Sequence, residues 1–296
     1  MSFRQSQEER RGISKIYRKM KKIFKIATLI LLTTIISCQD VVDVDLETTK
    51  ERLVIEALIR WENGTQGNEQ IVKLSKTASF YNNQIVPVDN ANIVVKNLDT
   101  QQEFDFLLIE NGIYQTTNFV PVTNTNYELE VSYNGEIYKA TSILFAAPTI
   151  DDITQSIDGG FSLEDPEVNV IFQDFQNQED FYRMVFKLDR PSENEEIENF
   201  NFIFNDSFQE NNSISIFYEN EDFLPEDIIT SSIYKISEQF FDYLDKLELQ
   251  ADSGIGPFAS PPINVKGNII NVSLEENYPY GFFSLNQIDK AVYVFE

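Results

Sequence analysis

The sequence predicts a mainly β protein that carries one amphipathic helix in its C-terminal half. Short runs of β-branched and aromatic residues recur along a chain with 24 Phe and 13 Tyr, and turn signals separate these runs. In the run from Tyr127 to Tyr133, apolar residues alternate with polar ones, as in a strand with one buried face. Residues 237–250 are the clearest stretch with helical spacing. These patterns predict two β-rich domains, 51–147 and 148–296.

Residues 1–37 are expected to form a bacterial signal peptide. Three lysines between positions 21 and 25 precede an uncharged, mostly apolar run, Ile26–Ile36. A transmembrane helix needs about 20 apolar residues, so this run is too short to span a bilayer. Met20 opens a complete signal by itself and is the expected start of the protein.

The apolar run leads directly to Cys38, which is the only cysteine of the chain. Ile35, Ile36 and Ser37 before it fit the lipobox of bacterial lipoproteins, in which the cysteine is lipidated and becomes the mature N-terminus. Several acyl chains on one residue give a stable membrane anchor. The alternatives are an uncleaved signal anchor and cleavage at another small residue, with Cys38 incidental.

Residues 38–50 are predicted to be an acidic tether behind the lipidated cysteine. Asp40, Asp43, Asp45 and Glu47 resemble the acidic export signal of surface lipoproteins of Bacteroidetes, although valines interrupt them. We therefore expect a protein of the bacterial outer membrane that faces the cell surface.

Composition excludes several classes of function. The chain contains no histidine, so Ser-His-Asp and Cys-His catalysis, most zinc enzymes and haem ligation by histidine lack their essential residue. Without residues 1–37 the chain has 14 basic and 46 acidic residues, a formal net charge of −32. Such a surface repels phosphate backbones, so nucleic acid is not an expected partner.

The N-terminal domain, 51–147, is expected to be a β-sandwich of immunoglobulin-like or carboxypeptidase-regulatory-like type. Asn134-Gly135 indicates a tight hairpin, because both central positions of a type I′ turn need positive φ. Trp61 ends an apolar run and is expected to be a core residue or to lie at a domain edge, with a sugar-binding platform as the alternative. The predicted strands are 52–61, 70–77, 92–98, 103–109, 127–133 and 136–142.

The second domain, 148–296, is expected to be β-rich with the single helix 237–250. We expect a loop at 151–166, strands at 168–172, 181–188, 199–204 and 214–218, and paired terminal strands at 281–285 and 291–295. Ser237 is a suitable N-cap, and the apolar face of the helix is expected to pack on the core. The alternative is a helix that lines a groove for a partner.

The acidic stretch 219–227 is the strongest sequence candidate for weak calcium binding. It concentrates five carboxylates but lacks the ligand order of an EF-hand loop, so a solvated acidic loop is the favoured interpretation and no metal or other cofactor is expected. The five residues are Glu219, Glu221, Asp222, Glu226 and Asp227.

Several segments together resemble a Bacteroidetes lipoprotein family known as domain of unknown function 4249. Each motif is weak alone, but the resemblance covers nearly the whole mature chain and carries no catalytic motif. It implies an envelope location and a TonB-dependent β-barrel transporter as partner. The segments are the lipobox cysteine, Leu53–Ile59, Lys73–Thr77, Pro87–Val95, Gly112–Tyr114, Tyr127–Val131, Tyr138–Thr141, Asp180–Arg183, the helix 237–250, Pro257–Pro262, Gly267–Ile269 and Gly281–Phe283.

The leading functional expectation is a non-enzymatic accessory or binding subunit of such a transporter, held in the outer membrane by its lipid. One alternative is a surface glycan-binding protein or a carboxylate-based glycoside hydrolase, which needs only two suitably spaced acids. Another is a structural or adhesive envelope protein. No ligand is identified by the sequence.

Overall fold

The computed structural model describes residues 51–78, 84–159, 165–175, 179–191, 195–207, 213–252 and 264–296. No helix among them is both long enough and apolar enough to span a membrane. The described residues are mainly β, with one α-helix, as expected. Their elements are β1 Leu53–Glu62, β2 Gln70–Lys76, β3 Val86–Pro87, β4 Asn92–Asn97, β5 Glu103–Glu110, β6 Ile113–Thr116, β7 Asn126–Tyr133, β8 Glu136–Phe145, β9 Ile150–Gly159, β10 Asp165–Gln173, β11 Phe181–Arg190, β12 Glu195–Asn205, β13 Ser213–Glu219, β14 Ile228–Ile236, α2 Glu238–Asp252, β15 Ile270–Asn271, the 3-10 helix η1 Glu275–Asn277 and β16 Tyr280–Val294.

The described strands form two sheets. The larger has thirteen strands in the order β12-β11-β14-β16-β1-β2-β6-β5-β4-β7-β8-β15, with β3 paired to β2. β16 also pairs with β8 through Leu285 and Asn286, so the hydrogen-bonded path from β1 to β8 returns to β16. The smaller sheet has the order β13-β10-β9. The sandwich type expected for 51–147 and the division at 147 stay predictions.

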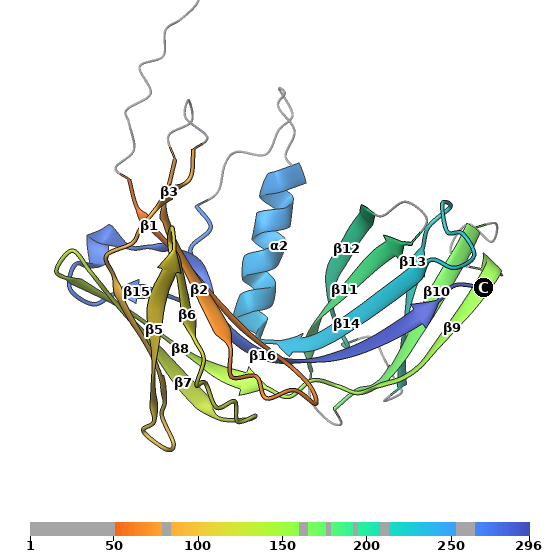
Figure 1. The fold of residues 1–296 in the computed structure, drawn as a ribbon, viewed down its shortest axis with the longest axis horizontal. Coiled ribbons are helices and arrows are strands. Elements are labelled where there is room, and N and C mark those ends of the chain that lie inside the picture. Colours follow the sequence, from red (N-terminus) through yellow and green to blue (C-terminus); the bar gives the residue numbers. More distant parts are fainter. Residues whose placement is uncertain are drawn as a thin grey trace, which may run out of the picture. The chain divides into compact units, whose positions relative to one another are not determined.

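The last strand joins both halves of the large sheet. Tyr280 to Ile288 run parallel to β1, and Asp289 to Val294 run antiparallel to β14 (Figure 1). The expectation of two paired terminal strands is therefore wrong. No turn interrupts β16, because residues 286–290 stay extended while the strand changes its partners.

Two further expectations need correction. Residues 151–166 are not one loop, because β9 spans Ile150–Gly159 and pairs with β10. Asp151 and Asp152 look like loop residues but are exposed residues of β9. The prediction also missed β14, which ends at Ile236, one residue before the predicted helix.

Three apolar clusters make up the core. The first lies among β1–β8 and includes Ile55, Phe104 and Tyr127; the second joins β10 and β13 to β11 and β14 and includes Phe172 and Phe186. The third lies on the opposite face of β14, where α2 covers the sheet; it consists of Tyr234, Ile236, Phe240 and Phe282, with partly buried neighbours. The positions of the apolar residues in β11 explain this arrangement, since Tyr182, Met184 and Phe186 face one cluster and Phe181 and Val185 the other.

The helix confirms the sequence prediction closely. It spans Glu238–Asp252, and the backbone N–H of Phe240 donates to Ser237 Oγ at 3.1 Å, which makes Ser237 the N-cap. Phe240 is buried against the sheet, as the apolar stripe predicts, but Leu247 is 40% exposed. The last turns of α2 therefore leave part of the apolar stripe open, and a groove lies there.

Candidate functional site

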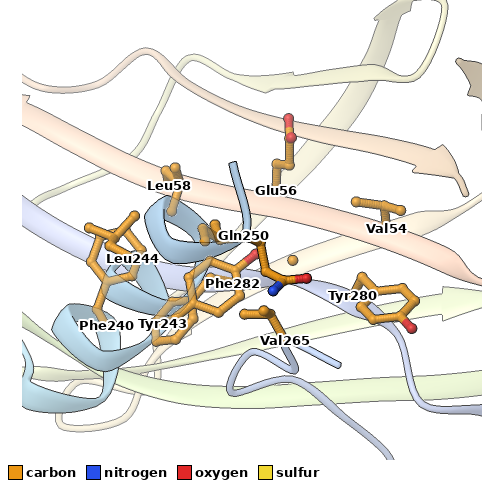
Figure 2. A pocket seen from close by; sticks show the side chains of 12 residues that line it. Val54, Glu56, Leu58, Phe240, Tyr243, Leu244, Gln250, Val265, Tyr280 and Phe282 are labelled. Carbon is orange, nitrogen blue, oxygen red and sulfur yellow. The ribbon is translucent and has the colours of Figure 1, made fainter. Parts of the chain in front are cut away.

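A groove of about 440 Å³ lies between α2 and the paired strands β1 and β16 (Figure 2). The parallel register pairs Val54 with Tyr280, Glu56 with Phe282 and Leu58 with Ser284, which brings alternate residues of both strands to the face of the sheet under the helix. The lining is mostly apolar and consists of Val54, Glu56, Leu58, Phe240, Tyr243, Leu244, Leu247, Gln250, Val265, Tyr280, Gly281 and Phe282.

Aromatic rings form one side of this groove. The ring centroid of Phe282 lies 4.6 Å from that of Phe240 and 5.0 Å from that of Tyr243. Figure 2 shows Tyr280 at the other side, with the amide of Gln250 between the two groups. Burial raises the pKa of Tyr243, and the nearby negative charge of Glu56 raises it further. The groove therefore presents an apolar, aromatic surface with a few polar groups, which is the usual composition of a binding site.

Two glycines allow the backbone to approach closely at β16, one within that strand and one in the segment before β15. Gly281 has φ +97°, and a Cβ there would lie 2.0 Å from the carbonyl oxygen of Ile55 on β1. A Cβ at Gly267 would lie 1.7 Å from the carbonyl oxygen of Gly281. Both glycines belong to motifs that carried the sequence resemblance, so packing at this groove explains those motifs.

A second candidate is a cluster of three aspartates at the opposite face of β14. Carboxylate oxygens of Asp174, Asp180 and Asp206 lie within 4.8 Å of one another, and Asp180 and Asp206 are buried. Two hydrogen bonds connect Asp180 and Asp206. The backbone N–H of Asp180 donates to Asp206 Oδ1 at 2.9 Å, and the backbone N–H of Asp206 donates to the Asp180 carbonyl at 3.2 Å. No other described residues bring three metal-binding side chains together in this way.

Neighbouring side chains already occupy these carboxylates. Lys235 forms a salt bridge with Asp180, and the Tyr182 hydroxyl donates to Asp174. Burial raises the pKa of Asp174, and the adjacent Asp206 carboxyl raises it too, while the hydrogen bond from Tyr182 opposes the rise. Oxygen donors suit calcium, but the ammonium group of Lys235 already compensates part of the charge. The arrangement is a buried ion-pair network and by itself identifies no metal.

The acidic residues considered for calcium do not converge on one point. Asp227 is buried and receives hydrogen bonds from Arg190 Nε at 2.8 Å and Nη2 at 3.0 Å. The Glu226 backbone N–H donates to the carbonyl of Phe295 at 2.8 Å, and its φ is +77°. Burial opposes ionisation of Asp227, but Arg190 and the Leu224 N–H outweigh it and lower the pKa of Asp227.

The other three acidic residues of that stretch, Glu219, Glu221 and Asp222, line a hollow of about 550 Å³ beside aromatic rings. The rings of Phe200 and Tyr218 stack there with centroids 5.3 Å apart and planes 7° apart. Phe217 on β13 is 49% exposed at the same place. Sequence reasoning missed this group, because its rings come from β12 and β13, which belong to different sheets.

The remaining candidates lie elsewhere. Ile35, Ile36, Ser37 and Cys38 are outside the described residues. Trp61 is partly buried against the first core cluster, as the expectation of a core residue predicts, and its Nε1–H donates to the Thr65 carbonyl at 2.9 Å.

No curated protein matches this chain. Among solved structures, a DUF4785 family protein from Legionella pneumophila shares 8% identity over 62% of this chain, with a TM-score of 0.25; the match spans 52% of that protein, about half its length. The FN1–FN3 domains of chicken CNTN1 share 13% identity over 57% of this chain and 56% of theirs, with a TM-score of 0.20. The chicken interferon gamma receptor alpha chain shares 9% identity over 62% of this chain and 86% of its own, also with a TM-score of 0.20. Likenesses at this level carry no functional inference.

A protein-family model matches most of the chain. The model described as "Domain of unknown function (DUF4249)" matches residues 39–291, which includes β1, α2, both groove glycines and nearly all of β16. The chain therefore belongs to the DUF4249 family.

Proposed function

We propose that this protein is a non-enzymatic, lipid-anchored protein of the bacterial outer membrane, displayed on the cell surface, that acts as an accessory subunit of a TonB-dependent transporter. The observation that carries the proposal is the signal-like segment that ends at the sole cysteine, Cys38. Family membership is compatible with it but assigns no activity. An immunoglobulin-like or carboxypeptidase-regulatory-like sandwich at 51–147 belongs to this proposal as a scaffold for binding.

The groove beside α2 is the proposed contact with the transporter. Leu247 is exposed there next to Leu244 and the rings of Tyr243 and Phe282, so an apolar side chain of the partner would gain buried area. The carboxylate of Glu56 stands at the same groove, which favours a partner segment that combines apolar residues with a positive charge.

The test is an affinity pull-down of the tagged, lipidated chain from detergent-solubilised outer membranes. Leu247→Glu places a charge in the groove and should reduce recovery of a TonB-dependent β-barrel at least tenfold. Leu249→Glu is the matched control, because Leu249 lies on the same helix, is 58% exposed and does not line the groove. Cys38→Ala tests the anchor. Equal recovery with Leu247→Glu and Leu249→Glu would exclude the groove, and recovery of no barrel by a correctly localised wild type would exclude the transporter role.

Surface glycan binding is the second candidate, supported by the exposed rings beside β12 and β13. Phe200 and Phe217 are exposed next to three carboxylates and Asn220, a combination suited to stacking and hydrogen bonding with a sugar. Phe217→Ala should abolish retention on a glycan array. Leu224→Ala is the control, because Leu224 is equally exposed but does not line the hollow.

Two alternative functions, carboxylate-based glycoside hydrolysis and a structural or adhesive envelope role, have less support than the two candidates above. Hydrolysis would need carboxyls open to a substrate, whereas Asp180 and Asp206 are buried and Asp180 is paired with Lys235. An adhesive role would show as altered cell attachment without a transporter partner.

A further inference from the structure

Two arginines meet at one tyrosine on the sheet face that carries the third core cluster. Arg183 on β11 is the direct cross-strand partner of Tyr234 on β14, and Arg60 reaches the same ring from β1. The guanidinium carbons of Arg60 and Arg183 lie 5.7 and 6.0 Å from the centroid of the Tyr234 ring. Each of these two cationic groups therefore lies near the same aromatic ring.

Neither Arg60 nor Arg183 takes part in the ion pairs found in the described part of the chain. The ion pairs found there join other side chains, for example Lys187 with Asp189 at 3.0 Å and Lys290 with Glu62 at 2.6 Å on the same face. The chain holds 48 acidic and 23 basic residues, so acidic neighbours are plentiful. Two arginines that lie near one ring and form no ion pair with a carboxylate are therefore unexpected in this protein.

Hydrogen-bond donors at the same place lack acceptors as well. Tyr234 is 2% exposed, and its hydroxyl has no hydrogen-bond partner among the described residues. The Nε of Arg183 is buried and also has none there, although its Nη2 donates to Asn201 Oδ1 at 2.9 Å. Buried donors are nearly always satisfied in folded proteins, because an unmade hydrogen bond is costly. The site therefore lacks an acceptor.

The missing acceptor has a definite chemistry. A guanidinium group presents several N–H donors in a planar fork that matches the two oxygens of a carboxylate or phosphate, and a tyrosine hydroxyl adds a further donor. Arg60 is exposed, so the site opens to solvent on its side. We propose that Arg60, Arg183 and Tyr234 bind a small oxyanion group, a phosphate or a carboxylate.

The test uses the intact chain in a nonionic detergent at pH 7 and constant ionic strength. Inorganic phosphate is followed by its 31P line width, and acetate by saturation transfer to its methyl protons. Each probe is titrated separately, so the result distinguishes a phosphate site from a carboxylate site. The wild type should bind one of the two, and Arg183→Gln should weaken that binding at least tenfold.

Tyr234→Phe keeps the test decisive if Arg183→Gln fails to fold. It removes only the hydroxyl, so it should weaken anion binding about tenfold while leaving the thermal midpoint in anion-free buffer unchanged or higher, because an unsatisfied group has been removed. Lys187→Gln is the charge control on the same strand and should change binding less than twofold. Absence of binding by both probes overturns the proposal, as does equal loss in Lys187→Gln and Tyr234→Phe. A lower midpoint in Tyr234→Phe without anion would show that the hydroxyl already has a partner and would also overturn it.

Discussion

Replacing Lys235 by methionine should destabilise the protein strongly, because it leaves buried negative charge without a partner. The substitution keeps an unbranched side chain of similar length and removes only the ammonium group. In the wild type this group pairs with Asp180, next to Asp174 and Asp206, and lies 4.9 Å from the ring centroid of Phe175. The side chains of Lys235 and Asp180 are only 14% and 3% exposed, so water cannot replace the lost interaction fully.

Breaking a buried ion pair by removing one partner typically costs about 3–5 kcal/mol. Because the lysine head group is slightly exposed, we expect about 3 kcal/mol for Lys235→Met at pH 7. Asp180→Asn should cost a similar amount. The double variant should cost less than the sum of the two, because neither charge is then left alone.

Urea denaturation of the wild type and the three variants measures these free energies. The slope against urea should stay constant, so that shifted midpoints report stability alone. A loss below about 1 kcal/mol for Lys235→Met, or full additivity in the double variant, would show that the three aspartates do not depend on Lys235.

The pH dependence of the same variant gives a separate check. The pKa of Asp174 is raised by burial and by Asp206, so this group favours folding below its ordinary pKa, and that contribution is lost as the pH rises through the raised value. Without Lys235 this effect should grow. The difference in stability between the wild type and Lys235→Met should therefore shrink as the pH falls from 7 towards 4.

Two further substitutions test other parts of the structure. Gly281→Ala should lower the free energy of unfolding by at least about 3 kcal/mol in thermal unfolding, because the strain of positive φ and the contact with the Ile55 carbonyl add together. Gly64 also has positive φ but open space around it, so Gly64→Ala should lower the free energy of unfolding by only about 1 kcal/mol. Equal losses would show that the contact is easily relieved. Arg190→Gln should destabilise the protein at pH 7 and much less at pH 3, because the lowered pKa of Asp227 makes its contribution present above the ordinary pKa and lost as the pH falls. A pH-independent loss in urea titrations would mean that Arg190 acts only through packing.

Local signals in the sequence were sufficient where one element determines its own structure. Asn134 and Gly135 have φ values of +50° and +81° between β7 and β8, as a type I′ turn requires. The helix at Ser237 was likewise predictable from its cap and its spacing. By contrast, β9 is rich in Asp and Ser, and its extended form depends on pairing with β10, which local composition does not reveal.

The candidate sites were less accessible from sequence, because each combines residues from distant segments. Asp174, Asp180 and Asp206 come from two separate loops, and nothing in their spacing distinguishes them among 48 acidic residues. Arg60 and Arg183 look like ordinary residues of two separate strands in the sequence, and only the pairing of β14 and β16 brings these strands into one sheet. The resemblance motifs include Asp180, Arg183, Gly267 and Gly281, but a motif by itself does not show which residues meet in space.

The long final strand explains why the groove and the Arg60–Arg183 pair lie in one continuous sheet. β1 is the first strand and β14 lies late in the sequence, yet both pair with β16 (Figure 1). Arg60 on β1 and Tyr234 on β14 are therefore separated by β16 alone. The same strand supplies Tyr280, Gly281 and Phe282 to the groove. A change that shifts β16 against β1, such as Gly281→Ala, should thus alter both places, whereas Leu247→Glu and Tyr234→Phe should each affect only one.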